Sequence, residues 1–154
     1  MPIDAPHLHL MLTHLPVIGG PFLLLLLSIG LARRSSEIVT VALVLTVGLA
    51  AATGGVYLTG EPAEEALEHA PWFPEQLTDS HEDRAEVALA ATLATGALAV
   101  MALVFRRAGR WLPRLVWSGL LLSSLALGLT AWSGGQIRHD EIRSPAVSRP
   151  SPGT

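Results

Sequence analysis

Three histidines from well-separated parts of the chain, His14, His81 and His139, could together bind a metal ion or a haem. Imidazole nitrogen is a ligand for zinc, copper and iron, and a pair of imidazoles can hold haem iron on its two faces. Carboxylates could complete a mixed nitrogen and oxygen shell around a metal, and three stand in the same regions of the chain: Glu61, Glu65 and Glu82. Such a shell suits zinc, iron, manganese or copper(II).

The remaining histidines, His7, His9 and His69, have simpler interpretations than a cofactor site. His7, Met11 and His14 recur at i, i+4 and i+7, so one helical stripe would offer two imidazoles and a thioether, a set that suits copper or haem. His7 and His9 lie close to the N-terminus, however, where solvation explains them, and it also explains His69. His14 lies about 9 Å inside the apolar part of its helix at ~1.5 Å per residue. A polar side chain at that depth should face the other helices, so His14 is the functional prediction.

Four apolar runs must position these groups: residues 15–32, 38–58, 87–105 and 115–133. None contains a charged residue, and each has about the ~20 residues that a helix needs to cross a bilayer. Half of all residues, 50%, are hydrophobic, which is more than a soluble chain of 154 residues could bury. The sequence therefore predicts an all-α fold, a four-helix transmembrane bundle running up-down-up-down, with a short outer-face helix between the second and third spans.

The domain organisation follows from these runs. One membrane domain is expected over residues 1–143, with spans at about 8–32, 38–58, 84–105 and 113–134 and an outer loop at 59–83. The first helix is expected to begin after Asp4, with Pro6 in its first turn. Asp79 and Glu82 resemble a capping box at the start of the third long helix, and Gly134 with its neighbouring glycine should end the fourth. Residues 144–154 are rich in proline and serine and predict a disordered tail.

The arginines predict the orientation. Six of the ten lie in the first and third connections between spans, which are short and should stay cytoplasmic by the positive-inside bias. Both termini and the loop 59–83 then lie outside, in the periplasm of a bacterium with this multi-pass protein in its inner membrane. All six histidines and twelve of the thirteen carboxylates share that outer side.

The composition of the chain excludes several kinds of cofactor site and several functions. The chain has no cysteine, so it has no disulfide, thiolate metal site or iron–sulfur cluster. A net charge of −3 and the lack of lysine argue against nucleic-acid binding. The second, third and fourth apolar runs hold no histidine, which excludes two haems stacked across the bilayer. His81-Glu82 is not followed by the second histidine of an HExxH motif, so the sequence does not favour a stand-alone enzyme.

Four segments carry a family resemblance: THLPVIG in the first helix, YLTGEPAEE after the second, HE at the start of the third and GGQIRHDEI after the fourth. Together they resemble a family of small four-helix proteins of the bacterial inner membrane, over nearly the whole length up to about Arg143. The resemblance implies a site without implying an activity. The positions it points to are His14, Tyr57, Glu61, Glu65, His81, Glu82, Gly135 and His139.

The functional hypothesis is an outer-face site that binds one haem b or one transition metal. His14, His81, His139 and Tyr57 would contact the cofactor, in membrane electron transfer or as an accessory to a redox complex. The expected partners are the lipid bilayer, a quinol or periplasmic redox partner and a larger membrane complex. The alternative is a structural or accessory subunit whose polar residues only stabilise the outer loop.

Overall fold

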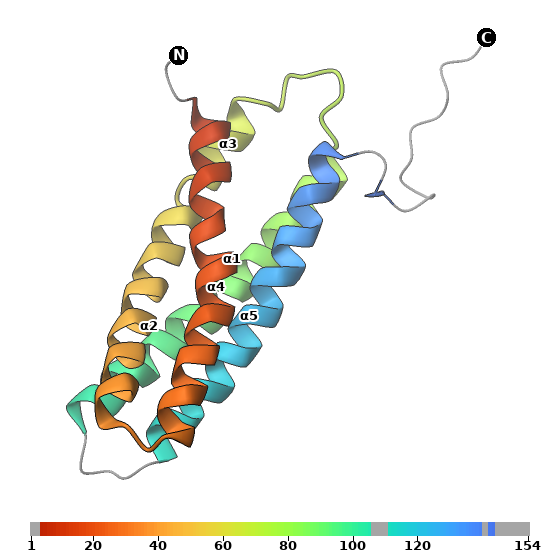
Figure 1. The fold of residues 1–154 in the computed structure, drawn as a ribbon. Helices are drawn as coiled ribbons and strands as arrows, with labels where there is room; N and C mark the ends of the chain where they lie inside the picture. The colour runs from red at the N-terminus through yellow and green to blue at the C-terminus, as the bar shows by residue number, and fades with distance from the viewer. Residues whose placement is uncertain (1–3, 106–110, 140–141, 144–154) are drawn as a thin grey trace.

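The computed structural model describes residues 4–105, 111–139 and 142–143, and within them the regular structure is helical (Figure 1). Four long helices form a bundle: α1 (Ala5–Ala32), α2 (Ser36–Tyr57), α4 (Glu75–Val104) and α5 (Trp111–Arg138), with a short α3 (Gly60–Glu65) between α2 and α4. All four long helices are long and apolar enough to cross a membrane. This confirms the prediction of an all-α fold with four membrane-length helices.

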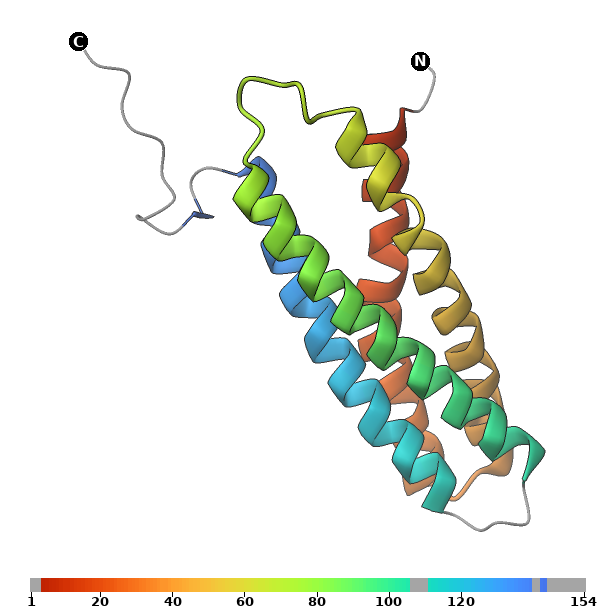
Figure 2. The same cartoon turned by 180° about the vertical axis from the view of Figure 1, so that it is seen from behind.

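The helices pack as neighbours around the bundle. α1 contacts α2 and α5, α2 contacts α4, and α4 lies along α5, as Figures 1 and 2 show from opposite sides. The predicted tail over residues 144–154 lies outside the described residues.

The first helix begins where the sequence predicts. The side chain of Asp4 accepts a hydrogen bond from the backbone N–H of His7 at 3.0 Å, and Pro6 stands in the first turn, where its missing N–H costs no hydrogen bond. At the other end, only Arg33, Arg34 and Ser35 separate α1 from α2. Arg34 has a φ of 55°, in the left-handed region, and this conformation closes the turn.

The third long helix begins before its predicted cap. α4 starts at Glu75, within the expected outer loop 59–83, so Asp79 lies inside the helix instead of capping it. A helix of 30 residues is about 45 Å long, against a hydrocarbon core of about 30 Å. All the charged residues of α4 come before Val87. The charge-free runs 15–32, 38–58, 87–105 and 115–133 are the parts of these helices most suited to cross a membrane, and the first turns of α4 project beyond its run.

The last helix ends later than predicted. α5 continues through Gly134 and Gly135 to Arg138, so the glycines do not stop it. A Cβ added at Gly134 would lie only 3.0 Å from Cε1 of His81 on α4. Gly134 therefore lets two helices approach closely.

Small residues bring the helices together inside the bundle, as expected in lipid, where apolar side chains gain little by leaving their surroundings. A Cβ at Gly96 of α4 would lie 2.5 Å from that of Ala50 on α2, and a Cβ at Gly20 of α1 would lie 2.8 Å from the hydroxyl of Ser124 on α5. On α4 one stripe of small residues is buried: Ala88, Thr92, Thr95 and Ala99.

Candidate functional site at the polar end of the bundle

The start of α1, α3, the start of α4 and the end of α5 gather at one end of the bundle (Figures 1 and 2). We call this the polar end, and it comprises residues 4–14, 57–86, 130–139 and 142–143. It contains all six histidines of the chain. The opposite end, which holds Arg33, Arg34 and Arg114, is the basic end.

His14 does not turn into the bundle, so that prediction of its orientation is wrong. Its side chain is exposed, and its Nδ1 lies 2.8 Å from the carbonyl oxygen of Leu10, one turn earlier in the same helix. The buried row of α1 runs through Pro16, Gly20 and Leu23. Residues two apart in a helix differ by about 200° around its axis, so His14 faces away from Pro16. His7 and Met11 of the predicted ligand stripe are exposed with it.

His9 takes the inward position instead. It lies seven residues before Pro16, on the same face, and is half-buried. Its Nδ1 lies 2.8 Å from the hydroxyl oxygen of Thr59, and that hydroxyl donates to the carbonyl of Val56 at 2.6 Å. Because the Thr59 proton is already used, Nδ1 of His9 must be the donor. A neutral His9 then presents a bare lone pair on Nε2.

His81 reaches toward α5 and is also half-buried. Its Nδ1 lies 3.0 Å from the carbonyl oxygen of Thr130 and 3.2 Å from the hydroxyl of Ser133, which itself donates to that carbonyl at 2.9 Å. A carbonyl only accepts, so Nδ1 of His81 carries the proton and Nε2 is bare. Burial lowers the pKa of His81 below its ordinary value, which favours this neutral form at pH 7.

His9 and His81 form a pair across the polar end. They come from α1 and α4, and burial, with the charge of a protonated His81 as a second cause, lowers the pKa of His9 below its ordinary value. Each is tied through Nδ1 to a different neighbour, His9 to the residue before α3 and His81 to α5. The sequence analysis missed His9, although its seven-residue spacing from Pro16 was the signal that could have found it.

His139 follows the last residue of α5, and its side chain is exposed. Its backbone N–H donates to the carbonyl of Gly135 at 3.0 Å, and its own carbonyl accepts from Ile142 at 3.3 Å. Across the described ranges, no group of three or more histidines and carboxylates is arranged to hold a metal ion. The predicted mixed shell of His14, His81 and His139 with carboxylates is therefore not formed there.

A carboxyl pair joins α3 to α4. Glu64, which the sequence analysis also missed, shares a hydrogen bond with the side chain of Glu82. This hydrogen bond, with partial burial and the charge of Glu82, raises the pKa of Glu64 from 4.5 to about 7. Glu64 can therefore hold a proton near neutral pH and donate it toward Glu82 in this hydrogen bond. The predicted ligands Glu61 and Glu65 are both exposed.

Tyr57 lies on the acidic side of this end. Its hydroxyl donates to Oε1 of Glu86 at 3.3 Å, which links the end of α2 to α4. The charges of Glu86, Glu82 and Glu61 all act on it. The structure thus places Tyr57 among carboxylates, in a contact between α2 and α4 beside the α3–α4 contact made by the carboxyl pair.

The segment between α3 and α4 is anchored to α5. The guanidinium of Arg138 lies 4.7 Å from the ring centroid of Trp72, a cation–π contact. Below this segment lies an open hollow of about 380 Å³. Its lining is mostly acidic and consists of Glu64, Glu68, His69, Phe73 and Glu75.

No protein-family model, curated protein or solved structure matches this chain.

Proposed function

We propose that the polar end binds one haem b between His9 and His81, and that the protein serves in membrane electron transfer. In this proposal the four long helices cross a bacterial inner membrane up-down-up-down, with both termini and the polar end on the periplasmic side. The observation that carries the proposal is the pair of half-buried imidazoles, His9 and His81, from opposite helices of the bundle. This pair of proposed ligands differs from the one predicted from the sequence, because His9 takes the place of His14 while His81 is retained.

The donor set favours haem over a directly bound metal ion. A metal held by protein side chains alone needs three or four ligands, and no such group occurs among the described residues. Haem iron receives four nitrogens from the porphyrin and needs only two from the protein. Two imidazoles are therefore enough for haem and too few for a closed zinc site.

The hydrogen bonds of the two rings also suit axial ligation. Axial histidines are oriented by a hydrogen bond from the ring nitrogen that does not bind the metal. Thr59 and Thr130 accept such bonds from Nδ1 of His9 and His81, so Nε2 is the unprotonated nitrogen of both rings. A bound haem b would supply reversible one-electron chemistry, and the protein would fix its position.

The carboxyl pair suits a partner that releases protons. A quinol loses two protons and two electrons when it becomes a quinone. Glu64, whose pKa is raised to about 7 by its hydrogen bond with Glu82, lies at the same end of the bundle as the imidazoles. The pair can therefore take up a proton from such a donor or return it to the periplasm.

The test is an optical spectrum of the protein purified in mild detergent from haem-sufficient cells. We expect a Soret band at one haem per chain, and we expect His9→Ala and His81→Ala to abolish it. His14→Ala is the matched control, since His14 is an exposed histidine of the same helix, and it should keep the band.

Two results would count against the proposal. Absence of any haem from the wild-type protein, even after supplementation, would leave the alternative of a structural or accessory subunit. Loss of haem in His14→Ala with retention in His9→Ala would show that a different pair of ligands is used.

A further inference from the structure

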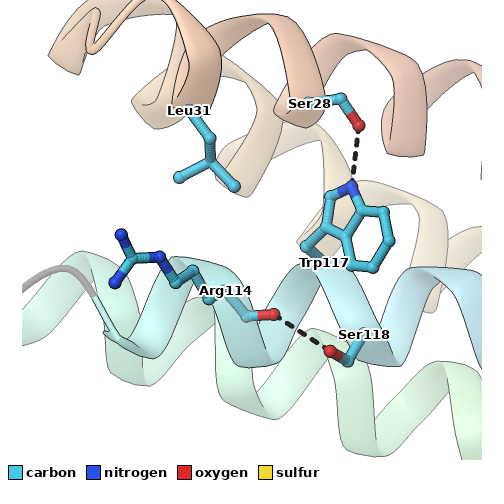
Figure 3. Close-up of a pocket in the computed structure, with 5 residues that line it drawn as sticks. All are labelled: Ser28, Leu31, Arg114, Trp117 and Ser118. Carbon is cyan, nitrogen blue, oxygen red and sulfur yellow. Dashed lines mark hydrogen bonds between the residues drawn. The ribbon is translucent and has the colours of Figure 1, made fainter.

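A second cavity lies at the basic end, between α1 and α5, far from the histidines. It has a volume of about 430 Å³ and is lined by Ser28 and Leu31 of α1 and by Arg114, Trp117 and Ser118 of α5 (Figure 3). The volume is within the range of pockets that hold small organic ligands. It lies at the inner boundary of the spanning segments, because Arg114 immediately precedes the run 115–133.

The polar groups of the wall are already satisfied within the protein. The indole N–H of Trp117 donates to the hydroxyl of Ser28 at 2.7 Å, and this hydroxyl donates to the carbonyl of Leu24 at 2.7 Å. The hydroxyl of Ser118 donates to the carbonyl of Arg114 at 3.3 Å (Figure 3). What remains for a ligand is the flat face of the indole and the side chain of Leu31. This part of the cavity therefore suits a hydrocarbon chain.

Arg114 gives the cavity a charged rim. Figure 3 shows Trp117 reaching from α5 to Ser28, while the guanidinium of Arg114 lies on the side of Leu31. The side chain of Arg114 is exposed, and no carboxylate among the described residues pairs with it. Arg33 and Arg34 are exposed at the same end. The rim therefore complements an anion at the level of the lipid headgroups.

We propose that this cavity binds an anionic phospholipid, with its phosphate at Arg114 and one acyl chain along Trp117 and Leu31. Basic pockets between transmembrane helices bind anionic headgroups. Each arginine near the membrane surface raises the affinity for them about fivefold. Trp111, which is exposed one turn before Arg114, has the amphipathic ring that favours the same interface. The site is independent of the polar end and of any cofactor there.

The experiment is native mass spectrometry of the delipidated full-length protein with added lipids. Phosphatidylglycerol is compared with phosphatidylcholine of identical acyl chains, and glycerol phosphate is added as the headgroup without chains. The wild-type protein should retain phosphatidylglycerol in preference to phosphatidylcholine. In Arg114→Gln this preference should be about fivefold smaller. Arg84→Gln removes one exposed arginine at the polar end and should change nothing.

A second variant tests the cavity itself. Ser118→Leu fills the space from an exposed helix position without removing a charge, and it should weaken retention of both lipids. If Arg114→Gln and Arg84→Gln lose the preference for phosphatidylglycerol equally, the preference depends only on the net charge of the protein, and the proposal is overturned. Full competition by glycerol phosphate would also overturn it, because the site would then bind a free phosphate. If Ser118→Leu does not fold, the comparison of the two arginine variants still decides.

Discussion

The imidazole Nδ1 of His9 lies 2.8 Å from the hydroxyl oxygen of Thr59, so the first turns of α1 are hydrogen-bonded to the residue that precedes α3. This bond fixes both the tautomer and the direction of the ring. We predict that Thr59→Val lowers haem affinity about tenfold, the smaller end of the loss typical when the orienting partner of a ligand is removed. Haem titration followed by absorbance measures it. Thr59→Ser keeps the hydroxyl and should bind as the wild type does, whereas equal affinity in all three proteins would show that the bond has no role.

Gly134 should control the position of His81. A Cβ there would lie 3.0 Å from Cε1 of the imidazole, so Gly134→Ala must displace the ring and weaken its bond to the carbonyl of Thr130. The nitrogen NMR shifts of labelled His81 report this change. Gly135→Ala is the control, because its Cβ would make only an ordinary contact of 3.5 Å with Ile142. That control should gain up to about 1 kcal/mol from helix propensity. An unchanged His81 spectrum in Gly134→Ala would contradict the prediction.

The carboxyl pair predicts a stability that depends on pH. The hydrogen bond with Glu82 raises the pKa of Glu64 from 4.5 in an unfolded chain to about 7 in the folded one. The folded protein therefore holds this proton more tightly. Its stabilising contribution is complete below about pH 4.5 and is lost as the pH rises through about 7. The protection factor of the α3 amides, which is the intrinsic exchange rate at each pH divided by the observed rate, should therefore fall across this range.

Two variants separate this effect from the general charge of the polar end. Glu64→Gln keeps a hydrogen-bond donor toward Glu82 but cannot titrate, so the protection factor of the α3 amides should lose this pH dependence. Glu65→Gln neutralises an exposed neighbour and should retain it. The same pH dependence in both variants would mean that the shared proton is not its cause.

Close approach of α2 and α4 predicts the cost of a single methyl group. In Gly96→Ala the new Cβ would lie 2.5 Å from the Cβ of Ala50, so the helices must separate. We expect a loss of about 1–3 kcal/mol in the free energy of unfolding, as for other overpacked cores. Gly48→Ala, where a Cβ meets nothing within 4 Å, should cost nothing. Reversible unfolding in mixed micelles measures both, and Ala50→Gly added to Gly96→Ala should restore stability.

The sequence predicted the number and class of the helices because charge-free apolar runs are a local property. It predicted the start of α1 for the same reason, since the Asp4 cap and Pro6 act within one turn. The boundaries of α4 and α5 were wrong because both helices continue beyond the spanning segments, where the pattern becomes polar. There each helix is stabilised by the other, as the contact of His81 with Thr130 and Gly134 shows.

The candidate site was predicted only in part because depth does not specify rotation about the helix axis. His14 is deeper than His9, but a membrane helix is apolar on all sides, so hydrophobicity does not mark its buried face. The small residues mark it, and Gly20 with Pro16 places His9 inward. The Glu64–Glu82 pair depends on how α3 meets α4, which no spacing along the chain encodes.

Arg34 has further importance for how the chain enters a membrane. Its left-handed backbone, with a φ of 55°, costs roughly 1–2 kcal/mol for a residue with a side chain, and glycine would remove that strain. Glycine would also remove one of the two charges that keep this turn in the cytoplasm under the proposed orientation. Backbone conformation and insertion therefore make opposite demands on one position. The arginine there keeps the charge, so that α1 and α2 can insert together as a helical hairpin with a basic tip.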